Sequence, residues 1–334
     1  MHRIKIAQIG TSRNSHGSDI FWSLRKQSDI FEVVGYAFPE NEREKYPERM
    51  YAFEGAREMT VEEILNDPEI EAVTVETEEC YLTKYAQMVA DAGKHMHMEK
   101  PGGYVLADFE KLIATVKKNQ TVFHTGYMYR YNPYVIELME SIKKGELGEI
   151  ISVEAQMNCR HSDELRSWLK NYKGGSMFFL GCHLIDLIFR IKGAPEHITV
   201  FNRSTGLDGI DSEDFGMVAM EYKNGVSFAK VNSTEVGGFS RRQLVVAGSK
   251  KTIELNPLEM FGDGGQFTTR IDHCADKANW GDRGIITNTE IYDRYDAMMR
   301  SFAQMVCKEK ENPYTYDYEL ELYRTILKCC NITD

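Results

Sequence analysis

The chain has 334 residues, which at roughly 150 residues per domain suggests two domains. Its hydrophobic fraction of 42% and charged fraction of 27% are ordinary for globular proteins and argue against a disordered or fibrous chain. The formal net charge of −11 argues against a broad basic surface for nucleic acid or anionic lipid. No stretch approaches the ~18 unbroken apolar residues of a membrane helix, and the N-terminus lacks a cleavage-site pattern, so we expect a cytoplasmic protein.

The first third of the chain alternates short apolar runs with helical periods, as βαβ units do. The expected strands are Ile4–Ile9, Phe31–Ala37, Ala72–Val75, His95–Met98 and Thr121–His124. The expected helices are Asp19–Gln27, Val61–Asn66, Leu82–Ala92 and Ala107–Lys118. This pattern predicts an α/β dinucleotide-binding domain over residues 1–124, with a doubly wound parallel sheet of the Rossmann type.

After residue 125 the apolar pattern changes to longer strands joined by hairpin turns. Residues 151–159 alternate apolar and polar side chains, and Asn224-Gly225 marks a tight turn between two strands. The expected strands after this one are Phe215–Tyr222, Val226–Thr234, Gln243–Ala247 and Lys251–Leu255. The expected helices are Pro133–Lys144, Met177–Ile191, Asn288–Lys308 and Tyr318–Cys329. We therefore expect a second, α+β domain over residues 125–334, with a large and mostly antiparallel open sheet.

No cysteine or histidine spacing indicates a metal site. The seven cysteines are scattered without a CxxC pair, which favours reduced thiols in a reducing compartment. His95 and His97 have an HxH spacing, but no third ligand is evident, so we interpret them as strand residues.

The turn after the first expected strand is the candidate phosphate-binding loop. It contains Gly10 and Gly17 but has Ser12 where a GxGxxG turn has its middle glycine, and it is longer. The candidate cofactor-binding residues here are Gly10, Thr11, Ser12, Arg13 and Asn14. An ordinary loop before a helix explains the same residues about equally well.

An acid near the end of the second expected strand commonly binds the adenosine ribose hydroxyls. Glu40 is the candidate, although a solvated acid in a loop is an equal alternative. An acid at this place favours NAD over NADP, and nearby Arg43 leaves NADP open.

Four further segments share their order with a known family. They read AGKHMHMEKP at 92–101, GYMYRYNP at 126–133, LGEI at 147–150, and GGS at 174–176 followed by GCHLID at 181–186. The chain resembles the glucose-fructose oxidoreductase, inositol dehydrogenase and MocA (Gfo/Idh/MocA) family in these segments. The resemblance covers most of the chain, from Ile4 to about Asp186 by motif.

The resemblance implies a Rossmann domain holding NAD or NADP, and a second domain for the substrate side and often for an oligomer interface, as in a homodimer or homotetramer. It places Lys100 between nicotinamide and substrate, where a lysine can share a proton with a substrate hydroxyl. Glu99 and Pro101 beside it are candidate cofactor contacts. A surface lysine at a strand end is the less favoured alternative.

The sequence departs from this family at two places. The helix over Met177–Ile191 aligns Phe179, His183 and Asp186, where family members usually have aspartate four residues before the histidine. His183 is then expected to act as base or substrate ligand without that carboxylate, and a hydrogen-bonded core histidine is the alternative. Where the family has a Pro-Asn pair, this chain reads Glu76-Thr77-Glu78-Glu79. We favour a solvated acidic helix start there, with Thr77 near the cofactor, and the alternative is that the acids select a cationic or polyhydroxylated ligand or hold a divalent ion.

The candidate substrate-binding residues are Tyr127, Arg130, Arg160, Trp168, Phe179 and Asp186. Aromatic and hydroxyl-bearing side chains suit a sugar or cyclitol, although Tyr127 also suits a domain seam and Arg160 and Trp168 suit a flexible polar loop. The expected function is an NAD(P)-dependent oxidoreductase acting on CH-OH groups of a small-molecule substrate. The alternatives are redox-assisted elimination, as in NAD-dependent glycosidases, and a non-catalytic ligand-binding relative.

Overall fold

The computed structural model describes residues 2–274 and 283–332, which form two compact units. The N-terminal unit contains Met1–Met128 and Tyr295–Tyr323, and the C-terminal unit contains Tyr129–Arg294 and Arg324–Asp334. This division differs from the expected contiguous one at residue 124. The reason is packing: Tyr323 stacks on Phe109 at a ring distance of 4.1 Å, so the segment 295–323 belongs with the first unit.

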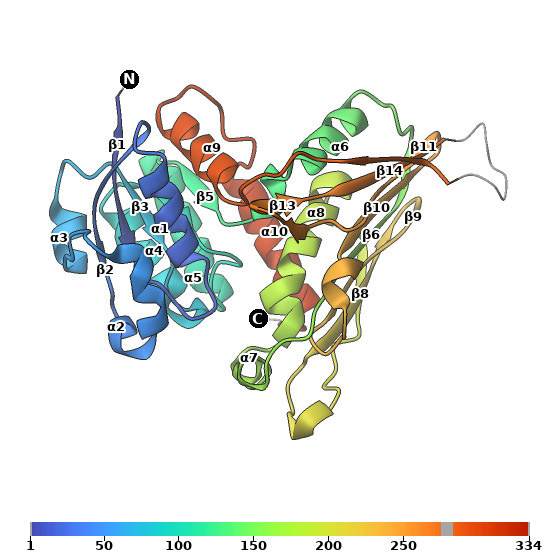
Figure 1. Ribbon diagram of the computed structural model, residues 1–334, viewed down its shortest axis with the longest axis horizontal. Coiled ribbons are helices and arrows are strands. Elements are labelled where there is room, and N and C mark those ends of the chain that lie inside the picture. The colour runs from blue at the N-terminus through green and yellow to red at the C-terminus, as the bar shows by residue number, and fades with distance from the viewer. Residues whose placement is uncertain (1, 275–282, 333–334) are drawn as a thin grey trace. The chain divides into compact units, whose positions relative to one another are not determined.

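The N-terminal unit is built on a parallel five-stranded sheet in the order β2-β1-β3-β4-β5, with helices on its faces (Figure 1). The strands are β1 (Ile4–Ile9), β2 (Phe31–Ala37), β3 (Ala72–Val75), β4 (His95–Met98) and β5 (Phe123–Thr125). The helices are α1 (Gly17–Lys26), α2 (Glu42–Lys45), α3 (Val61–Asn66), α4 (Glu79–Asp91), α5 (Leu106–Asn119), α9 (Asp296–Val306) and the first part of α10 (Tyr316–Cys329). Four of the five expected strands have the predicted bounds.

The sheet and helices of this unit are stabilised by burial and capping. Every residue of β3 is buried, as is typical of a parallel strand covered on both faces. At α3, Thr60 accepts from the amide of Glu63, whose side chain accepts from the amide of Thr60, a complete capping box. Because all five strands are parallel, the turns that follow them lie at one edge of the sheet.

The C-terminal unit is built on an eight-stranded sheet in the order β15-β14-β11-β10-β6-β9-β8-β7. Each neighbouring pair is antiparallel except β6 and β9, which are parallel. The strands are β6 (Ile150–Asn158), β7 (His197–Val200), β8 (Phe215–Tyr222), β9 (Gly225–Asn232), β10 (Gln243–Gly248), β11 (Lys251–Leu255), β14 (Thr269–Cys274) and β15 (Ile285–Asn288), with β12 (Met260–Gly262) and β13 (Gly265–Phe267) as a separate pair. The expected fold class is thus confirmed.

The helices of this unit are α6 (Pro133–Lys143), α7 (Asp163–Trp168), α8 (Cys182–Lys192) and the end of α10. The expected helix over 288–308 is wrong at its start, because Ile285–Asn288 pairs with β14 and the helix begins only at Asp296. The expected helix from Met177 begins as a π-helical turn, Met177–Gly181, before α8. A π turn advances fewer degrees per residue, so the regular α-helical spacing assumed between Phe179 and His183 does not hold.

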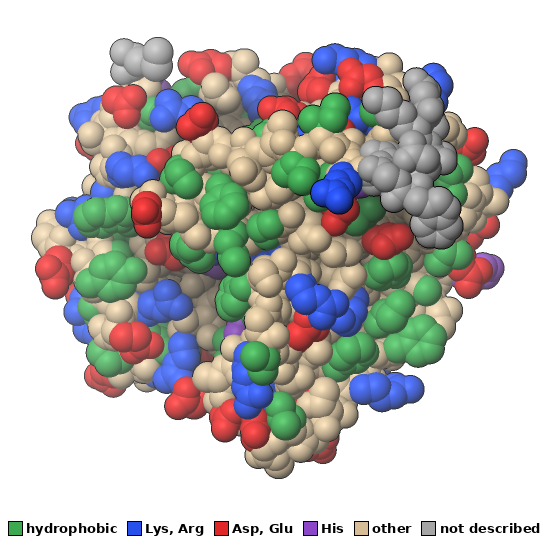
Figure 2. Space-filling model, turned by 45° about the vertical axis from the view of Figure 1, so that its right-hand side comes forward, with side chains coloured by type: hydrophobic (Ala, Val, Ile, Leu, Met, Phe, Trp, Pro, Cys, Tyr) green, Lys and Arg blue, Asp and Glu red, His purple; other side chains and the backbone are tan. Residues whose placement is uncertain are grey.

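The surface carries both signs of charge. On the face drawn in Figure 2, lysine and arginine side chains alternate with aspartate and glutamate, and hydrophobic side chains lie among them. Within residues 2–274 and 283–332, no helix has the length and apolar character needed to cross a membrane.

Candidate functional site

The turn between β1 and α1 requires glycine at its first position. Gly10 has φ +88°, and a Cβ there would lie 2.4 Å from the Thr77 methyl carbon and 2.7 Å from the Thr77 amide nitrogen. The buried Gln8 amide supports the turn from below, donating to the carbonyls of Gly10 and Gly17 at 3.0 Å each. The sequence did not single out Gln8, although its position inside an apolar strand was a usable signal.

This turn retains polar groups without partners in the described chain. The buried atoms Thr11 Oγ1, Thr77 Oγ1 and Glu42 Oε1 make no hydrogen bond with any described residue. The backbone amides of Arg13 and Asn14 likewise donate to no described residue. Buried polar groups of this kind fit a ligand that brings its own hydroxyls and anionic oxygens, such as a dinucleotide. Ser12 instead bonds locally, accepting from the amide of Ser15 at 3.0 Å.

A different acid from the expected one lies at this turn. Glu40 accepts hydrogen bonds from Lys84 at 2.7 Å and from the Tyr85 hydroxyl at 2.8 Å, away from the turn residues. Glu42 is 2% exposed, and its Oε2 accepts from the Thr11 amide at 3.0 Å. Burial raises the pKa of Glu42 to about 8, against the weaker lowering effect of the Thr11 hydrogen bond. The sequence could not show which of the two acids lies at the turn, because Glu40 and Glu42 differ in their packing and not in the local sequence pattern.

Arg43, which kept NADP open, is engaged within the unit. Its guanidinium pairs with Glu58 at 2.5 Å and donates to the Tyr36 hydroxyl at 3.0 Å. The charge that would neutralise a 2′-phosphate is thus already paired.

Lys100 follows β4 and is buried. Its side chain is 3% exposed, and its Nζ lies 3.9 Å from Glu99 Oε1. Glu99 also accepts from the Lys100 amide at 3.0 Å and lies 3.5 Å from the amide of His16 at the start of α1. The Lys100–Pro101 peptide is cis. The surface-lysine alternative is therefore wrong.

The acids after β3 are buried, so the expectation of a solvated acidic helix start is wrong for two of them. Glu76 is 0% exposed and Glu79 is 2% exposed. Burial raises the pKa of Glu79 to about 7, and it raises the pKa of Glu76 well above its ordinary value. No group of three or more histidine, cysteine or acidic residues in the described ranges is arranged to hold a metal.

In the C-terminal unit, His183 lies among aromatic side chains. It is 2% exposed, and its ring meets that of Tyr129 edge to face at 5.4 Å. Phe179 makes the same kind of contact with Trp168, also at 5.4 Å, and lies 6.4 Å from the ring of His161. Burial and the charge of Arg242 lower the pKa of His161 to about 4, so this imidazole is neutral.

Two other expected substrate residues bind each other. The guanidinium of Arg130 donates to Asp186 from Nε at 3.0 Å and from a terminal nitrogen at 2.7 Å, and both residues are buried. Such a fork is the strong form of an ion pair. Arg160 is about half exposed and pairs with Asp208 at 3.3 Å. Tyr127 is buried in the N-terminal unit.

A polar cluster that sequence reasoning missed surrounds Tyr129. Its hydroxyl donates to Glu259 at 3.0 Å and accepts from Arg242 at 3.4 Å, while Arg294 pairs with Glu259 at 2.7 Å. Tyr129, Arg242 and Arg294 lie far apart in the sequence, so no local motif identifies the cluster.

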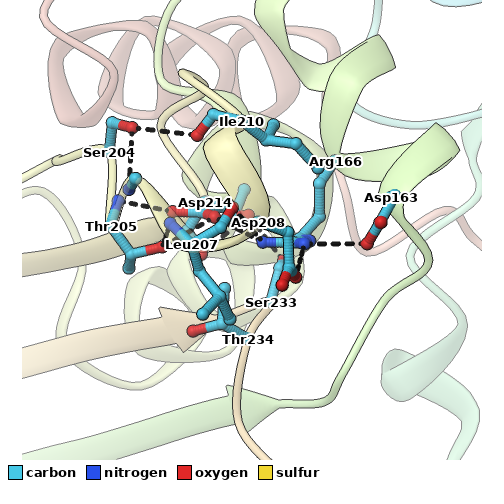
Figure 3. A network of polar contacts seen from close by, with 12 residues as sticks. Asp163, Arg166, Ser204, Thr205, Leu207, Asp208, Ile210, Asp214, Ser233 and Thr234 are labelled. Atoms are coloured by element: carbon cyan, nitrogen blue, oxygen red, sulfur yellow. Dashed lines mark hydrogen bonds and ion pairs between the residues drawn. The ribbon is translucent and has the colours of Figure 1, made fainter.

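The segment before Gly174 is not the flexible loop that was the alternative for Arg160 and Trp168. It contains α7, capped by Ser162, and the buried Arg166 of this helix pairs with Asp163, Asp208 and Asp214 (Figure 3). Asp214 also accepts from the amide and hydroxyl of Thr205. The network ties α7 to the 204–214 segment.

Comparison with known proteins agrees with this architecture. Residues 4–127 match the oxidoreductase family with an NAD-binding Rossmann fold, and residues 135–254 match the GFO/IDH/MocA C-terminal domain. The aldose-aldose oxidoreductase of Caulobacter crescentus has the same fold at a TM-score of 0.78 with 18% identity, over 99% of this chain and 98% of that one.

Two sequence relatives are similar over part of their length. The uncharacterized oxidoreductase YhhX of Escherichia coli (strain K12) is 30% identical over 43% of this chain and 41% of its own. The NADP(+) scyllo-inositol 2-dehydrogenase IolW of Bacillus subtilis (strain 168) is 26% identical over 48% and 46%. These matches span less than half of each relative. With both family domains present in order, the chain belongs to the Gfo/Idh/MocA family of oxidoreductases.

Proposed function

We propose that this protein transfers hydride between a nicotinamide cofactor and a CH-OH carbon of a sugar or cyclitol. The observation that carries the proposal is the buried Lys100, 3.9 Å from Glu99, at the same sheet edge as the Gly10 turn. The unpartnered polar groups of Thr11, Thr77 and Glu42 at that edge support a dinucleotide ligand.

The residues of the chain then have distinct roles. The nicotinamide, when bound, supplies the hydride chemistry. Lys100 orients the reacting oxygen and exchanges a proton with it. His183 is proposed as the second substrate contact; its ring orientation is held by Tyr129, since Phe179 offers no carboxylate for this purpose.

NAD is the proposed cofactor in preference to NADP. The Glu42 carboxyl is buried at the Thr11 amide with one oxygen unpartnered, so it can accept or donate a hydrogen bond to a ribose hydroxyl. A 2′-phosphate at the same place would meet this acid, while Arg43 is already paired with Glu58.

Thermal shift with NAD⁺, NADH, NADP⁺ and NADPH at millimolar concentration tests cofactor binding. Absorbance of the reduced nicotinamide during incubation with inositols and aldoses then tests turnover. We expect Gly10→Val to remove the thermal shift, because its side chain would collide with Thr77, and Lys100→Met to keep the shift but lose turnover. If no nicotinamide nucleotide shifts the melting temperature of the wild-type protein, the proposal is wrong.

A further inference from the structure

The segment 76–79, between β3 and α4, carries buried acids that the proposed function leaves without a role. Glu76 is 0% exposed and Glu79 is 2% exposed. Neither oxygen of Glu76 makes a hydrogen bond with any described residue, and the same is true of Glu79 Oε2. Burying an ionisable group without a partner is costly, so two such groups in one short segment require a physical explanation.

This segment lies against the candidate phosphate-binding turn. The amide of Ser12 donates to the carbonyl of Glu76 at 3.0 Å. A Cβ at Gly10 would lie 2.4 Å from the Thr77 methyl carbon, and a Cβ at Gly17 would lie 3.0 Å from the Cβ of Glu76. A ligand held by this turn therefore lies in the electrostatic field of the buried acids.

Glu99 and Lys100 follow β4 at the same edge of the sheet. The strand register pairs Val75 with Met98, so Glu76 and Glu99 each follow one residue of this pair. The carboxyl of Glu99 accepts from the Lys100 amide at 3.0 Å, and its Oε1 lies 3.9 Å from Lys100 Nζ. The ammonium of Lys100 thus already has one buried acid within ion-pair distance.

The charged groups that face Glu76 and Glu79 are mostly acids. They are one cation and three carboxyl groups: Lys100, Glu78, Glu99 and Asp19. The imidazole of His97 lies 3.6 Å from Glu76, but burial lowers its pKa to about 3, so it adds no positive charge. The charges of Glu99 and Lys100 offset each other when both are ionised, which leaves the net charge of this edge to the other acids.

Glu79 is the acid whose charge changes near neutral pH. Burial raises its pKa to about 7, against the lowering effect of the Lys100 charge. Burial also raises the pKa of Glu76 well above its ordinary value, and Glu99 and Asp19 raise it further, so Glu76 retains its proton more firmly than an ordinary glutamate. The edge of the sheet therefore becomes more negative as the pH rises through the pKa of Glu79.

We propose that Glu79 makes the cofactor site prefer the oxidised, cationic nicotinamide over the reduced, neutral one, and increasingly so as the pH rises. This inference rests on the proposed function, which places the nicotinamide beside Lys100, and goes beyond it in assigning a preference for one redox state to a buried acid. Tighter binding of the oxidised form makes the bound reduced form a stronger reductant, which favours reduction of a carbonyl substrate.

Reciprocity fixes the sign of the pH dependence. The cationic ring of NAD⁺ stabilises the ionised form of Glu79, so NAD⁺ binding lowers the pKa of Glu79 and releases a proton, whereas the neutral ring of NADH does not. At an effective dielectric of about 20, two unit charges about 12 Å apart shift a pKa by about one unit. A shift of that size raises the ratio of the NADH Kd to the NAD⁺ Kd roughly fivefold between about pH 6 and about pH 8.

Calorimetric titration of the protein with NAD⁺, NADH and ADP-ribose at about pH 6 and about pH 8 measures this preference. NAD⁺ and NADH differ in the charge of the ring, and ADP-ribose reports the pH effects on the part that they share. Titrations with NAD⁺ in buffers of different ionisation enthalpy count the released protons. We expect the Kd ratio to rise roughly fivefold with pH in the wild type, with proton release on NAD⁺ binding alone.

Glu79→Gln is the decisive variant, because glutamine has the size of glutamate but does not ionise. We expect its Kd ratio to be independent of pH. Glu62→Gln is the matched control, since Glu62 also lies in the first turn of a helix of this unit, α3, but is exposed. Its Kd ratio should follow that of the wild type. Circular dichroism and thermal unfolding confirm that each variant is folded.

The outcomes separate this inference from the proposed function. If NAD⁺ and NADH bind but their Kd ratio is independent of pH, or rises equally in Glu79→Gln, the preference assigned to Glu79 is wrong and the proposed function stands. If no nicotinamide nucleotide binds, both are wrong. If Glu79→Gln does not fold, the proton count of the wild type decides, and equal counts for NAD⁺ and NADH overturn the inference.

A further readout needs no cofactor. Carbon-13 spectra of the glutamate-labelled, cofactor-free protein should contain a carboxyl resonance that titrates near pH 7, which Glu79→Gln removes and Glu62→Gln retains. If no carboxyl group titrates in this range, the inference is wrong even if NAD⁺ binds more tightly than NADH.

Discussion

The two units bury their charges in different ways. In the C-terminal unit, the buried carboxylates Asp186, Asp214 and Glu259 each have a guanidinium partner: Arg130, Arg166 and Arg294. In the N-terminal unit, the Glu76 oxygens accept no hydrogen bond from any described residue, Glu99 accepts from the Lys100 amide, and Glu42 accepts from the Thr11 amide. An arginine partner compensates the cost of burying a carboxylate, whereas burial without such a partner raises the pKa of a carboxyl group. The first arrangement stabilises a fold, and the second leaves acids of raised pKa at the sheet edge where we propose that the cofactor binds.

The largest effect should come from the lysine of the N-terminal unit. Lys100→Met removes the group proposed to exchange a proton with substrate, so kcat should fall roughly 10²–10⁴-fold. The nicotinamide-induced thermal shift should remain, because the turn residues are unchanged. Lys117→Met, at an exposed lysine paired with Asp317, is the control and should retain activity. Steady-state kinetics check this, and equal rates in the two variants would contradict the assignment.

In the C-terminal unit the largest effect should be on stability. Arg166→Met leaves the fully buried Asp214 without its cation, which should lower the free energy of unfolding by about 3–5 kcal/mol. Denaturant unfolding with probes in each unit measures the loss. A loss of unfolding free energy confined to the C-terminal unit would support the difference in charge burial between the two units. A stability equal to that of the wild type would mean that the network contributes nothing.

Burial of Glu42 should make the free energy of unfolding of the N-terminal unit larger at low pH than at high pH. Its pKa rises from 4.5 to about 8 on folding, so the folded state holds the proton more tightly. The contribution is complete below the unfolded value and is lost as pH rises through about 8, at about 1.4 kcal/mol per pH unit in between. Unfolding free energies of wild type and Glu42→Gln should therefore be similar at about pH 5 and diverge as pH rises to about 8, with the variant becoming the more stable, because glutamine does not ionise. A pH-independent difference contradicts the burial of this acid.

The smallest effect should be at the outer end of the Arg166 network. The Asp163 side chain is 69% exposed, so Asp163→Asn should cost no more than about 1 kcal/mol. Added salt should shrink this difference further. A loss as large as that of Arg166→Met would show that the exposed acid, and not Asp208 or Asp214, holds the helix.

Much of the fold could be predicted because its signals are local. Four strands have the bounds that the sequence predicted: Ile4–Ile9, Phe31–Ala37, Ala72–Val75 and His95–Met98. A short apolar run between two helical segments marks such a strand within a few residues of its ends. The helix expected from Asn288 was wrong at its start because Ile285–Asn288 pairs with β14. This pairing depends on a strand elsewhere in the fold, and the local sequence pattern does not indicate it.

The sequence alone determined which motifs this chain has: the Gly10 turn, the Glu99-Lys100-Pro101 segment and the His183 helix, together with their order and family. Only the tertiary structure decided that Glu42 rather than Glu40 lies at the turn, that Glu76 is fully buried, and that Arg130 and Asp186 bind each other. The physical reason is that protonation and pairing depend on burial and on neighbours from distant strands. A side chain's own segment specifies neither.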